Sequence, residues 1–346
     1  MKYSLDILED YIGKGLVVKQ THPTLPLSIY NYSRTCQFGR YWDDITLNCR
    51  ALILDNEGNV IAKSFQKFFN IEELGPHEIP NEPFEVFEKM DGSLGLFFHY
   101  QGEWYMATKG SFISEQSVRG MKIARKYNLD KICVPGYTYI FEIIYPENMI
   151  CVNYGESERL VLLSIMDSDG VEIPYEDIVE SGEWDLVKKY DGISDFSVLK
   201  GMIADNAEGF VVRFKSGMRM KIKGKEYIRL HAILTNISTT SIWETLSNGG
   251  TMEDILNLVP DEVAEKVVEI IKDLAIRFDN IRKDYLSYYA DITLKIGTED
   301  RKAFAEQALR YNHSSILFSL LNGRDINPII WKIIKPKWRK IFATDI

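Results

Sequence analysis

The sequence has few cysteines and no long apolar run, and these absences exclude several classes of protein. It contains 4 cysteines and 5 histidines in 346 residues. The cysteines form no Cys-x-x-Cys pair and the histidines do not cluster, so neither a zinc site nor a disulfide framework is predicted. No apolar run approaches the roughly 20 residues that span a bilayer, and no signal peptide opens the chain. We therefore expect a soluble protein of the reducing cytoplasm, without a membrane partner.

An excess of positive charge is also missing. The formal net charge of -9 argues against a protein that coats nucleic acid nonspecifically, so any phosphate binding must come from local basic surfaces. Two segments are locally basic, residues 213–229 and the segment from Trp331 to Ile341, where Trp331 and Trp338 stand among lysines. The second segment suits RNA phosphates and unstacked bases, although an amphipathic helix with its lysines in solvent fits the pattern equally well.

The chain changes character near residue 230. Before it, short β-rich runs are separated by turn signals, such as Asp55-Asn56-Glu57-Gly58 and Gln101-Gly102, and a helix is predicted over 115–127. After it, apolar residues recur at helical spacing, most clearly over 260–285. Further helices are predicted over 299–310, 314–321 and 328–340. The pattern predicts an α+β domain of antiparallel sheets with flanking helices over residues 1–240, followed by an all-helical C-terminal domain over 241–346.

The most informative motif is Lys89-Met90-Asp91-Gly92-Ser93. Lys-x-Asp-Gly is the nucleophile motif of enzymes that hold AMP or GMP covalently on a lysine. Such an amine must lose its proton before it attacks phosphorus, which desolvation and nearby cations favour, and Gly92 lets the backbone turn tightly beside the nucleotide. A lysine before an Asp-Gly turn between two apolar runs is also what an ordinary hairpin looks like, so the motif alone leaves both interpretations open.

Further charged residues follow one another in otherwise apolar strands. Lysine-nucleotidyl chemistry needs several cations and at least two carboxylates, gathered from separate strands, to neutralise a triphosphate, hold a metal and grip a ribose. The chain supplies Arg50, Lys67, Lys109, Glu142, Glu208, Lys221 and Lys223. Lysines at alternate positions are often just the solvated face of an edge strand, but the same spacing puts both amines on one face. A carboxylate among apolar neighbours, as at Glu142, is costly to bury without a partner or ligand.

These motifs resemble those of the ATP-dependent RNA ligases of the covalent nucleotidyltransferase superfamily, most closely the anticodon-repair RNA ligases of T-even bacteriophages. The resemblance runs from about Tyr30 to His231 and covers Cys49-Arg50, Lys67-Phe68-Phe69-Asn70, Lys89-Met90-Asp91-Gly92-Ser93-Leu94, Lys109-Gly110-Ser111, Phe141-Glu142, Glu208-Gly209-Phe210-Val211 and Lys221-Ile222-Lys223 followed by Tyr227. One departure is Arg50-Ala51, where the family has Arg-Gly. This small-for-small change should be tolerated.

The resemblance implies a role for each matching residue. Lys89, within the motif that includes Asp91 and Gly92, would carry the AMP. Tyr30, Arg50, Lys67 and Lys223 would contact ATP, and Glu142 would grip its ribose. Glu208 would serve a magnesium or manganese ion, with Glu253 in the second domain as a further metal carboxylate. Lys109, Lys221, Phe69 and Tyr227 would be needed for activity, the last three at the ATP site.

The implied activity is an ATP-dependent RNA ligase that joins 5′-phosphate and 3′-hydroxyl RNA ends through lysyl-AMP and RNA-adenylate intermediates. The expected setting is RNA repair, with cleaved tRNA as a candidate substrate, by a monomer in the cytoplasm, that of the host if a phage encodes the protein. The helical tail favours RNA ligases, because DNA ligases and capping guanylyltransferases resemble one another in having a small β-barrel at this place. A capping-type guanylyltransferase and a catalytically silent RNA-binding scaffold are the alternatives.

Overall fold

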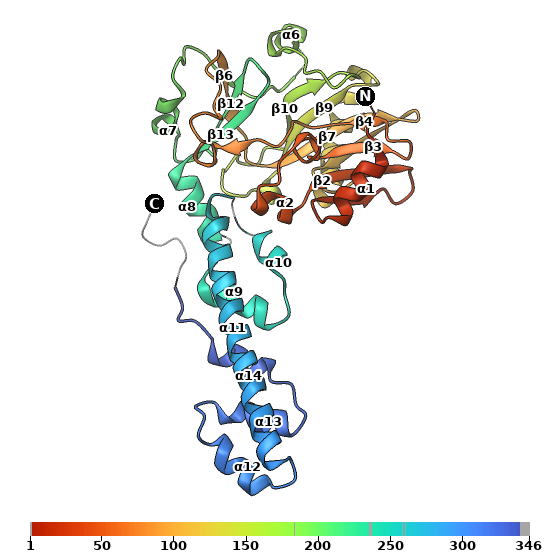
Figure 1. The fold of residues 1–346 in the computed structure, drawn as a ribbon. Coiled ribbons are helices and arrows are strands. Elements are labelled where there is room, and N and C mark those ends of the chain that lie inside the picture. Colours follow the sequence, from red (N-terminus) through yellow and green to blue (C-terminus); the bar gives the residue numbers. More distant parts are fainter. Residues whose placement is uncertain (1, 183, 235–236, 258, 260, 340–346) are drawn as a thin grey trace. The chain divides into compact units, whose positions relative to one another are not determined.

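The computed structural model describes residues 2–182, 184–234, 237–257, 259 and 261–339. The chain divides into two compact units, Met1–Ile228 and Arg229–Ile346. The boundary predicted between residues 240 and 241 lies within α9 (Thr239–Ser247), the first helix that begins in the second unit (Figure 1). The two units are described separately below.

Three sheets form the first unit, and all but one of their strand pairs are antiparallel. The first has the order β1-β2-β3-β4 and the second the order β10-β9-β7-β8. The third has the order β11-β6-β12-β13-β5, in which only β13 and β5 run parallel. The strands are β1 (Val17–Thr21), β2 (Leu27–Tyr32), β3 (Leu52–Asp55), β4 (Val60–Ala62), β5 (Phe69–Asn70), β6 (Phe84–Lys89), β7 (Ser93–Tyr100), β8 (Glu103–Thr108), β9 (Thr138–Ile144), β10 (Arg159–Met166), β11 (Lys189–Tyr190), β12 (Gly209–Phe214) and β13 (Arg219–Lys223).

Side-chain alternation along the strands builds two separate cores around the second sheet. Neighbouring residues of a strand point to opposite faces, so Phe97 packs with Phe141 and Ile123 of α4, while Phe98 packs with Ile53 of the first sheet. A third core, around Val212 and Met220, belongs to the third sheet. The helices of this unit are α1 (Leu5–Gly13), α2 (Arg34–Gly39), α3 (Asp44–Asn48), α4 (Glu115–Lys126), α5 (Leu129–Ile132), α6 (Tyr175–Ser181), α7 (Leu199–Met202) and α8 (Lys225–Leu234), whose last residues enter the second unit.

The described residues of the second unit contain helices and no strand. The long helix α11 (Asp261–Ile296) is followed by shorter helices (Figure 1). Tyr285 and Ile292 of α11 belong to one apolar core with residues of those helices. These are α12 (Arg301–Ala308), α13 (Ser314–Leu321) and α14 (Asn327–Ile333), and α10 (Met252–Leu256) precedes them. The predicted fold class, antiparallel sheets with helices followed by a helical region, is therefore confirmed. None of the described helices combines the length and the apolar character needed to cross a membrane.

The last predicted helix is shorter than expected. The sequence predicts it over 328–340, but α14 ends at Ile333 and the chain continues without helix through Arg339. Pro336 explains the difference, because a proline disfavours helical geometry at the residue before it and removes a backbone donor. Lys340 and Ile341, which close the predicted basic segment, lie outside the described residues, as does Pro260 at the predicted start of the long helix.

Candidate active site

The nucleophile motif connects two different sheets. Strand β6 ends at Lys89 in the third sheet, and β7 begins at Ser93 in the second. The two strands do not pair with each other, so the hairpin interpretation of the motif is wrong. The crossing places Lys89 beside the end of β12, where Gly209 is in register with both Lys89 and Lys223. Lys89 and Lys223 thus belong to one row across three strands.

Glu208 joins the two lysines of this row. Its Oε2 atom lies 2.6 Å from Lys89 Nζ and its Oε1 atom lies 3.3 Å from Lys223 Nζ. Burial alone would raise the pKa of this carboxyl, but the positive charges of Lys89 and Lys223 outweigh burial and hold the pKa below its ordinary value. Glu208 is therefore a buried carboxylate that both lysines hold in its charged form.

Glu142 is the second carboxylate of the site. Its Oε1 atom accepts a hydrogen bond of 3.0 Å from the backbone N–H of Gly92. Burial raises its pKa to about 7, although the charge of Lys89 opposes the shift. A side chain at position 92 would clash, since an added Cβ would lie 2.7 Å from the carbonyl oxygen of Ile143. Glycine is needed here because the motif passes directly against β9.

Asp91 anchors the motif. Its Oδ1 atom accepts a 2.8 Å hydrogen bond from the Tyr227 hydroxyl, and its Oδ2 atom accepts from the backbone N–H groups of Cys151 and Val152, both at 2.8 Å. The backbone N–H of Asp91 donates to the Tyr154 hydroxyl at 2.9 Å. Burial, followed by the nearby carboxylates, raises the pKa of Tyr227, which keeps its hydroxyl a donor. Both residues hold the loop that follows the nucleophile.

Lys221 is buried, although its alternation with Lys223 also suited a solvated edge strand. Its strand, β13, lies between β12 and β5, and Lys221 is in register with Val211 on one side and Asn70 on the other. The edge-strand interpretation is therefore wrong. Lys225, the next lysine of the same parity, is exposed as the first residue of α8.

Aromatic rings surround Lys67, which is 6% exposed. Its Nζ atom lies 5.3 Å from the ring centroid of Tyr32, 5.7 Å from Trp42 and 5.3 Å from Phe69. Tyr32 also accepts a 3.1 Å hydrogen bond from Lys109 Nζ at its hydroxyl. Tyr32 and Trp42 were not among the predicted site residues. Tyr32 carried a signal, because it lies two residues beyond Tyr30, where the resemblance to the RNA ligases begins.

Tyr30 lies elsewhere. It is 2% exposed and packs with Leu8 and Leu52 in the core beneath α1, and it does not line the cavity described below. Its predicted contact with ATP stays a prediction.

Arg50 and Ala51 precede β3. Arg50 donates from Nη1 to Ser64 Oγ at 2.6 Å, and its guanidinium lies 5.2 Å from the centroid of the Phe68 ring. Ala51 has a φ of 54°, in the left-handed region that glycine adopts freely and that costs another residue about 1 kcal/mol. The backbone N–H of Ala51 donates to Asn31 at 2.8 Å and holds this conformation. The alanine is accommodated at a small conformational cost.

One cavity extends from Lys89 into the first unit. Lys89, Arg50 and Glu142 line it, and so do the rings of Phe65, Phe68, Phe87 and Tyr175 together with apolar residues. Four further polar residues line the same cavity: Glu172, Arg213, Arg219 and Ser164.

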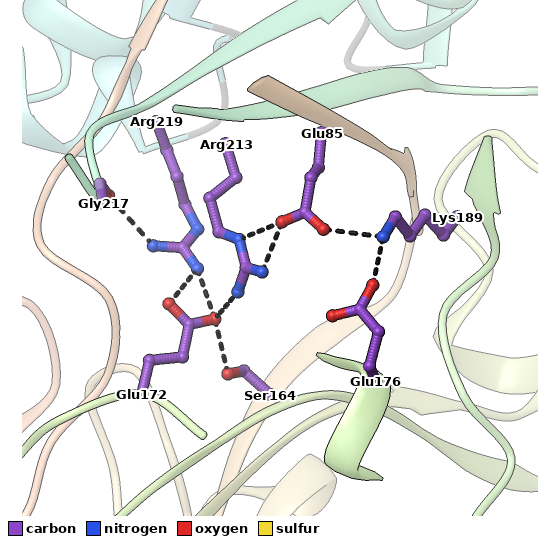
Figure 2. A network of polar contacts seen from close by, with 8 residues as sticks. All are labelled: Glu85, Ser164, Glu172, Glu176, Lys189, Arg213, Gly217 and Arg219. Atoms are coloured by element: carbon purple, nitrogen blue, oxygen red, sulfur yellow. Dashed lines mark hydrogen bonds and ion pairs between the residues drawn. The ribbon is translucent and has the colours of Figure 1, made fainter. Parts of the chain in front are cut away.

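These last four residues belong to a network of ion pairs and hydrogen bonds that we call the closed network: Glu85, Ser164, Glu172, Glu176, Lys189, Arg213, Gly217 and Arg219 (Figure 2). Arg213 donates from Nε to Glu85 and from Nη1 to Glu172, both at 2.9 Å. Arg219 donates from Nη2 to both oxygens of Glu172 at 2.5 Å, and Ser164 donates to Glu172 at 2.7 Å. Lys189 pairs with Glu85 at 2.7 Å and also with Glu176.

The two predicted metal carboxylates lie in different units. Glu208 is in the first unit, and Glu253 is an exposed residue of α10 in the second. No group of three or more His, Cys, Asp or Glu residues that could hold a metal occurs within the described part of the chain. Magnesium does not require such a group, because it takes most of its ligands from waters and substrate phosphates and needs only one or two carboxylates. Glu208 fits that requirement.

The predicted RNA-binding segment of the second unit is partly packed. Trp331 contacts the Phe278 ring, with centroids 4.8 Å apart, and Lys335 Nζ lies 4.5 Å from the centroid of the Trp243 ring. Trp338, in contrast, is 66% exposed. Of this segment, Trp338 presents an aromatic face to solvent.

The antiparallel sheets that carry these charged side chains, followed by a helical unit, have the architecture that the sequence predicts. The chain belongs to the RNA ligase family, whose sequence model matches residues 48–227, just over half of its length.

Relatives are found in viruses. An RNA ligase of Rhodothermus phage RM378 is 24% identical, over 86% of this chain and 85% of that protein. A protein of Autographa californica nuclear polyhedrosis virus, named as a bifunctional polynucleotide kinase/RNA ligase, is 24% identical over 62% of this chain, which spans only 35% of that relative.

Two solved structures are also similar. The archaeal ATP-dependent RNA ligase is 13% identical, with 92% of this chain and 96% of that chain covered and a TM-score of 0.46. The Naegleria gruberi RNA ligase with PPi is 16% identical, with 49% and 58% covered and a TM-score of 0.41. Because both scores are below 0.5, the assignment depends on the family match and on the architecture alone.

Proposed function

We propose that the protein is an ATP-dependent RNA ligase that joins 5′-phosphate and 3′-hydroxyl RNA ends through a lysyl-adenylate on Lys89. The observation that carries this proposal is the position of Lys89, which forms a row with Glu208 and Lys223 and lines a cavity together with Arg50 and Glu142. Lys223 and Arg50 place positive charge near the nucleophile Lys89, and this arrangement suits a substrate that carries several phosphates. Membership of the RNA ligase family supports RNA as the substrate to be joined.

In the first step, Lys89 gives up its ammonium proton to solvent, and the neutral amine attacks the α-phosphorus of ATP. A bond forms between Nζ and phosphorus, the bond to the pyrophosphate breaks, and Arg50 and Lys67 contact the leaving phosphates. Lys223 and Lys221 stay with the α-phosphate, and Glu142 grips the ribose. Glu208 would hold magnesium, which supplies positive charge against the phosphoryl oxygens when it is bound. Asp91 and Tyr227 hold the nucleophile loop in place through their hydrogen bond.

Two transfers complete the reaction. An oxygen of the RNA 5′-phosphate attacks the same phosphorus, the bond to Lys89 breaks, and the RNA end carries the AMP. A 3′-hydroxyl then attacks the RNA 5′-phosphate, the phosphodiester bond forms, and AMP leaves. The second unit would choose the RNA, with Trp338 and the neighbouring lysines on its bases and phosphates. The setting we propose is RNA repair in the cytoplasm, that of the host if a phage encodes the protein, by a monomer with cleaved tRNA as a candidate substrate. The viral relatives, which are named as RNA ligases, support the ligase part of this proposal.

The proposal is tested by looking for a covalent adduct between the protein and a nucleotide. The protein is incubated with radiolabelled ATP or GTP and magnesium, denatured, and examined for retained label. We expect retention from ATP, and none in the Lys89→Ala variant. That variant should still seal RNA that already carries a 5′-adenylate, because Lys89 is needed only to make the activated end. Retention from GTP alone would indicate a guanylyltransferase. RNA binding without any retained label would indicate a silent scaffold.

A further inference from the structure

We propose that the closed network selects the nucleobase, and that it favours adenine over guanine through Glu172 and Ser164. The proposal rests on the proposed function, because it assumes a nucleotide whose α-phosphorus lies at Lys89. Lys89 and four members of this network, Ser164, Glu172, Arg213 and Arg219, line one cavity, and the register of β6 with β12 sets Arg213 four residues from Lys89 along the strands. A nucleotide that occupies the cavity must therefore direct one of its ends towards the network.

Strand β6 gives the distance between Lys89 and the network. Glu85, Phe87 and Lys89 share one face of the strand, because side chains alternate along it. Four residues of strand correspond to about 13 Å, which is comparable to the length of a nucleoside monophosphate. On β12, Gly209 is in register with Lys89, Val211 with Phe87, and Arg213 with Glu85. A phosphate at Lys89 therefore puts the base beyond Phe87, next to Arg213.

The charge of the network argues against the opposite orientation of the nucleotide, in which the triphosphate would lie at the network and the base at Lys89. Its charged members are three acids, Glu85, Glu172 and Glu176, and three bases, Lys189, Arg213 and Arg219, each paired with another member. A set with no net charge gives little attraction for a triphosphate. It can still receive an uncharged ring with a polar edge, and the walls of the cavity are apolar and aromatic at this point.

Hydrogen bonding decides which base fits. Each nitrogen of the Arg213 guanidinium donates to a carboxylate, and both oxygens of Glu172 accept from Arg219. The hydroxyl of Ser164 donates to Glu172, and that of Tyr175 donates to the carbonyl of Val187 at 2.9 Å. Both hydroxyl oxygens keep lone pairs, and both residues line the cavity. Lone pairs accept from the N6 amino group of adenine and repel the O6 carbonyl of guanine.

The network also holds the Ser164 hydroxyl in place. Glu172 accepts three hydrogen bonds at Oε1, from Ser164, Arg213 and Arg219, and is 18% exposed. A carboxylate that accepts from all three can only have the Ser164 proton pointing towards it. An amide has only one acceptor oxygen, and the two arginines compete with Ser164 for it, so the Ser164 proton is held less firmly and can turn towards the base. Glu172→Gln should therefore weaken the preference for adenine without removing the shape of the side chain.

The experiment measures labelling of the full chain by ATP and by GTP at several concentrations, for wild type, Glu172→Gln and Glu158→Gln. Glu158 is a matched control, because it is a partly buried glutamate paired with Arg119 and does not line the cavity. We expect the ratio of ATP to GTP labelling efficiency to fall by about tenfold in Glu172→Gln, through KM, and to stay unchanged in Glu158→Gln. Thermal unfolding of each variant reports on folding.

A milder variant, Ser164→Ala, covers the case in which Glu172→Gln fails to fold. It removes one of the two acceptors and should shift the same ratio in the same direction. Equal losses with ATP and GTP in the folded variants would overturn the proposal, because they would show a structural role only. If wild type retains label from ATP and every ratio is unchanged, this inference fails while the proposed function stands. If wild type retains no label from either nucleotide, both fail.

Discussion

Two charged clusters face the same cavity, and they differ in how completely they neutralise themselves. In the closed network every acid has a cationic partner, and although burial acts in the opposite direction, Arg219 holds the pKa of Glu172 below its ordinary value. In the cluster around Lys89, Glu208 is similarly held, but burial raises the pKa of Glu142 to about 7. One cluster is electrostatically complete without a ligand and the other is not.

This difference indicates that the closed network is a preorganised part of the binding site and that the cluster around Lys89 is the reactive centre. A buried charge without enough compensation costs free energy, and such groups concentrate where a substrate supplies the missing partner. The cluster at Lys89 fits this description, since a nucleotide brings negative phosphates to Lys89 and ribose hydroxyls to Glu142. The closed network gains nothing from a charged ligand.

Removing a charge from the cluster around Lys89 should greatly slow adenylylation, while the protein stays folded. Glu208→Ala and Lys223→Ala should each lower labelling by ATP by orders of magnitude, since one preorganised charge contact contributes about 3 to 4 kcal/mol to transition-state stabilisation. Single-turnover labelling rates measure this. Lys225→Ala is the matched control, because Lys225 is exposed two residues beyond Lys223 and should have little effect. Equal, mild losses at all three positions would count against a phosphate-and-metal role for this cluster.

Removing a charge from the closed network should instead reduce stability. Arg213→Met leaves Glu85 and Glu172 facing each other with one cation fewer, and breaking a buried pair in this way costs about 3 to 5 kcal/mol. The comparison is Arg119→Met, which breaks a more exposed pair with Glu158 and should cost less than about 1 kcal/mol. Denaturant unfolding measures both. If Arg213→Met loses no more unfolding free energy than Arg119→Met, the charges of the network do not stabilise one another as described.

The raised pKa of Glu142 predicts a pH-dependent stability. Its pKa is about 7 in the folded chain against 4.5 for the ordinary group, so the folded state binds the proton more tightly. This contribution is fully present below pH 4.5 and is lost as the pH rises through 7. Relative to Glu142→Gln, which does not titrate, wild type should lose up to about 3 kcal/mol of unfolding free energy across that window. A difference between the two proteins that does not change with pH would contradict the shift.

Charge removal from the basic segment of the second unit should weaken RNA binding and leave the loading of AMP from ATP unchanged. Replacing Lys335, Lys337 and Lys340 together with Ala should weaken RNA binding and lower the slope of log affinity against log salt by up to about 2, because each lost phosphate contact removes roughly 0.7. A triple variant of Lys266, Lys272 and Lys283, all exposed on α11, removes the same charge from the same unit. Equal slopes in the two variants would mean that the segment has no special contact with RNA.

The sequence allowed the charged residues of the site to be predicted, but not which of them form ion pairs with one another. Residues such as Glu142 and Lys221 stood out because they interrupt apolar strands, and the structure gathers Lys89, Glu142, Glu208 and Lys223 at one site. The closed network could not be predicted, because Arg213 meets Glu85 through the register of β12 with β6, and meets Glu172 through a loop that follows β10. Strand registers and loop positions depend on contacts between distant segments, which no local pattern encodes.

The central claim is that Lys89 itself carries the nucleotide, and mass spectrometry of the loaded protein tests it most directly. After incubation with ATP and magnesium, the protein is digested and the peptide that contains Lys89 is sequenced by fragmentation. We predict an adenylyl group on the Lys89 side chain, and none on Lys221, Lys223 or Lys109. An adenylyl group on another lysine, or on no residue while RNA sealing proceeds, would contradict the account.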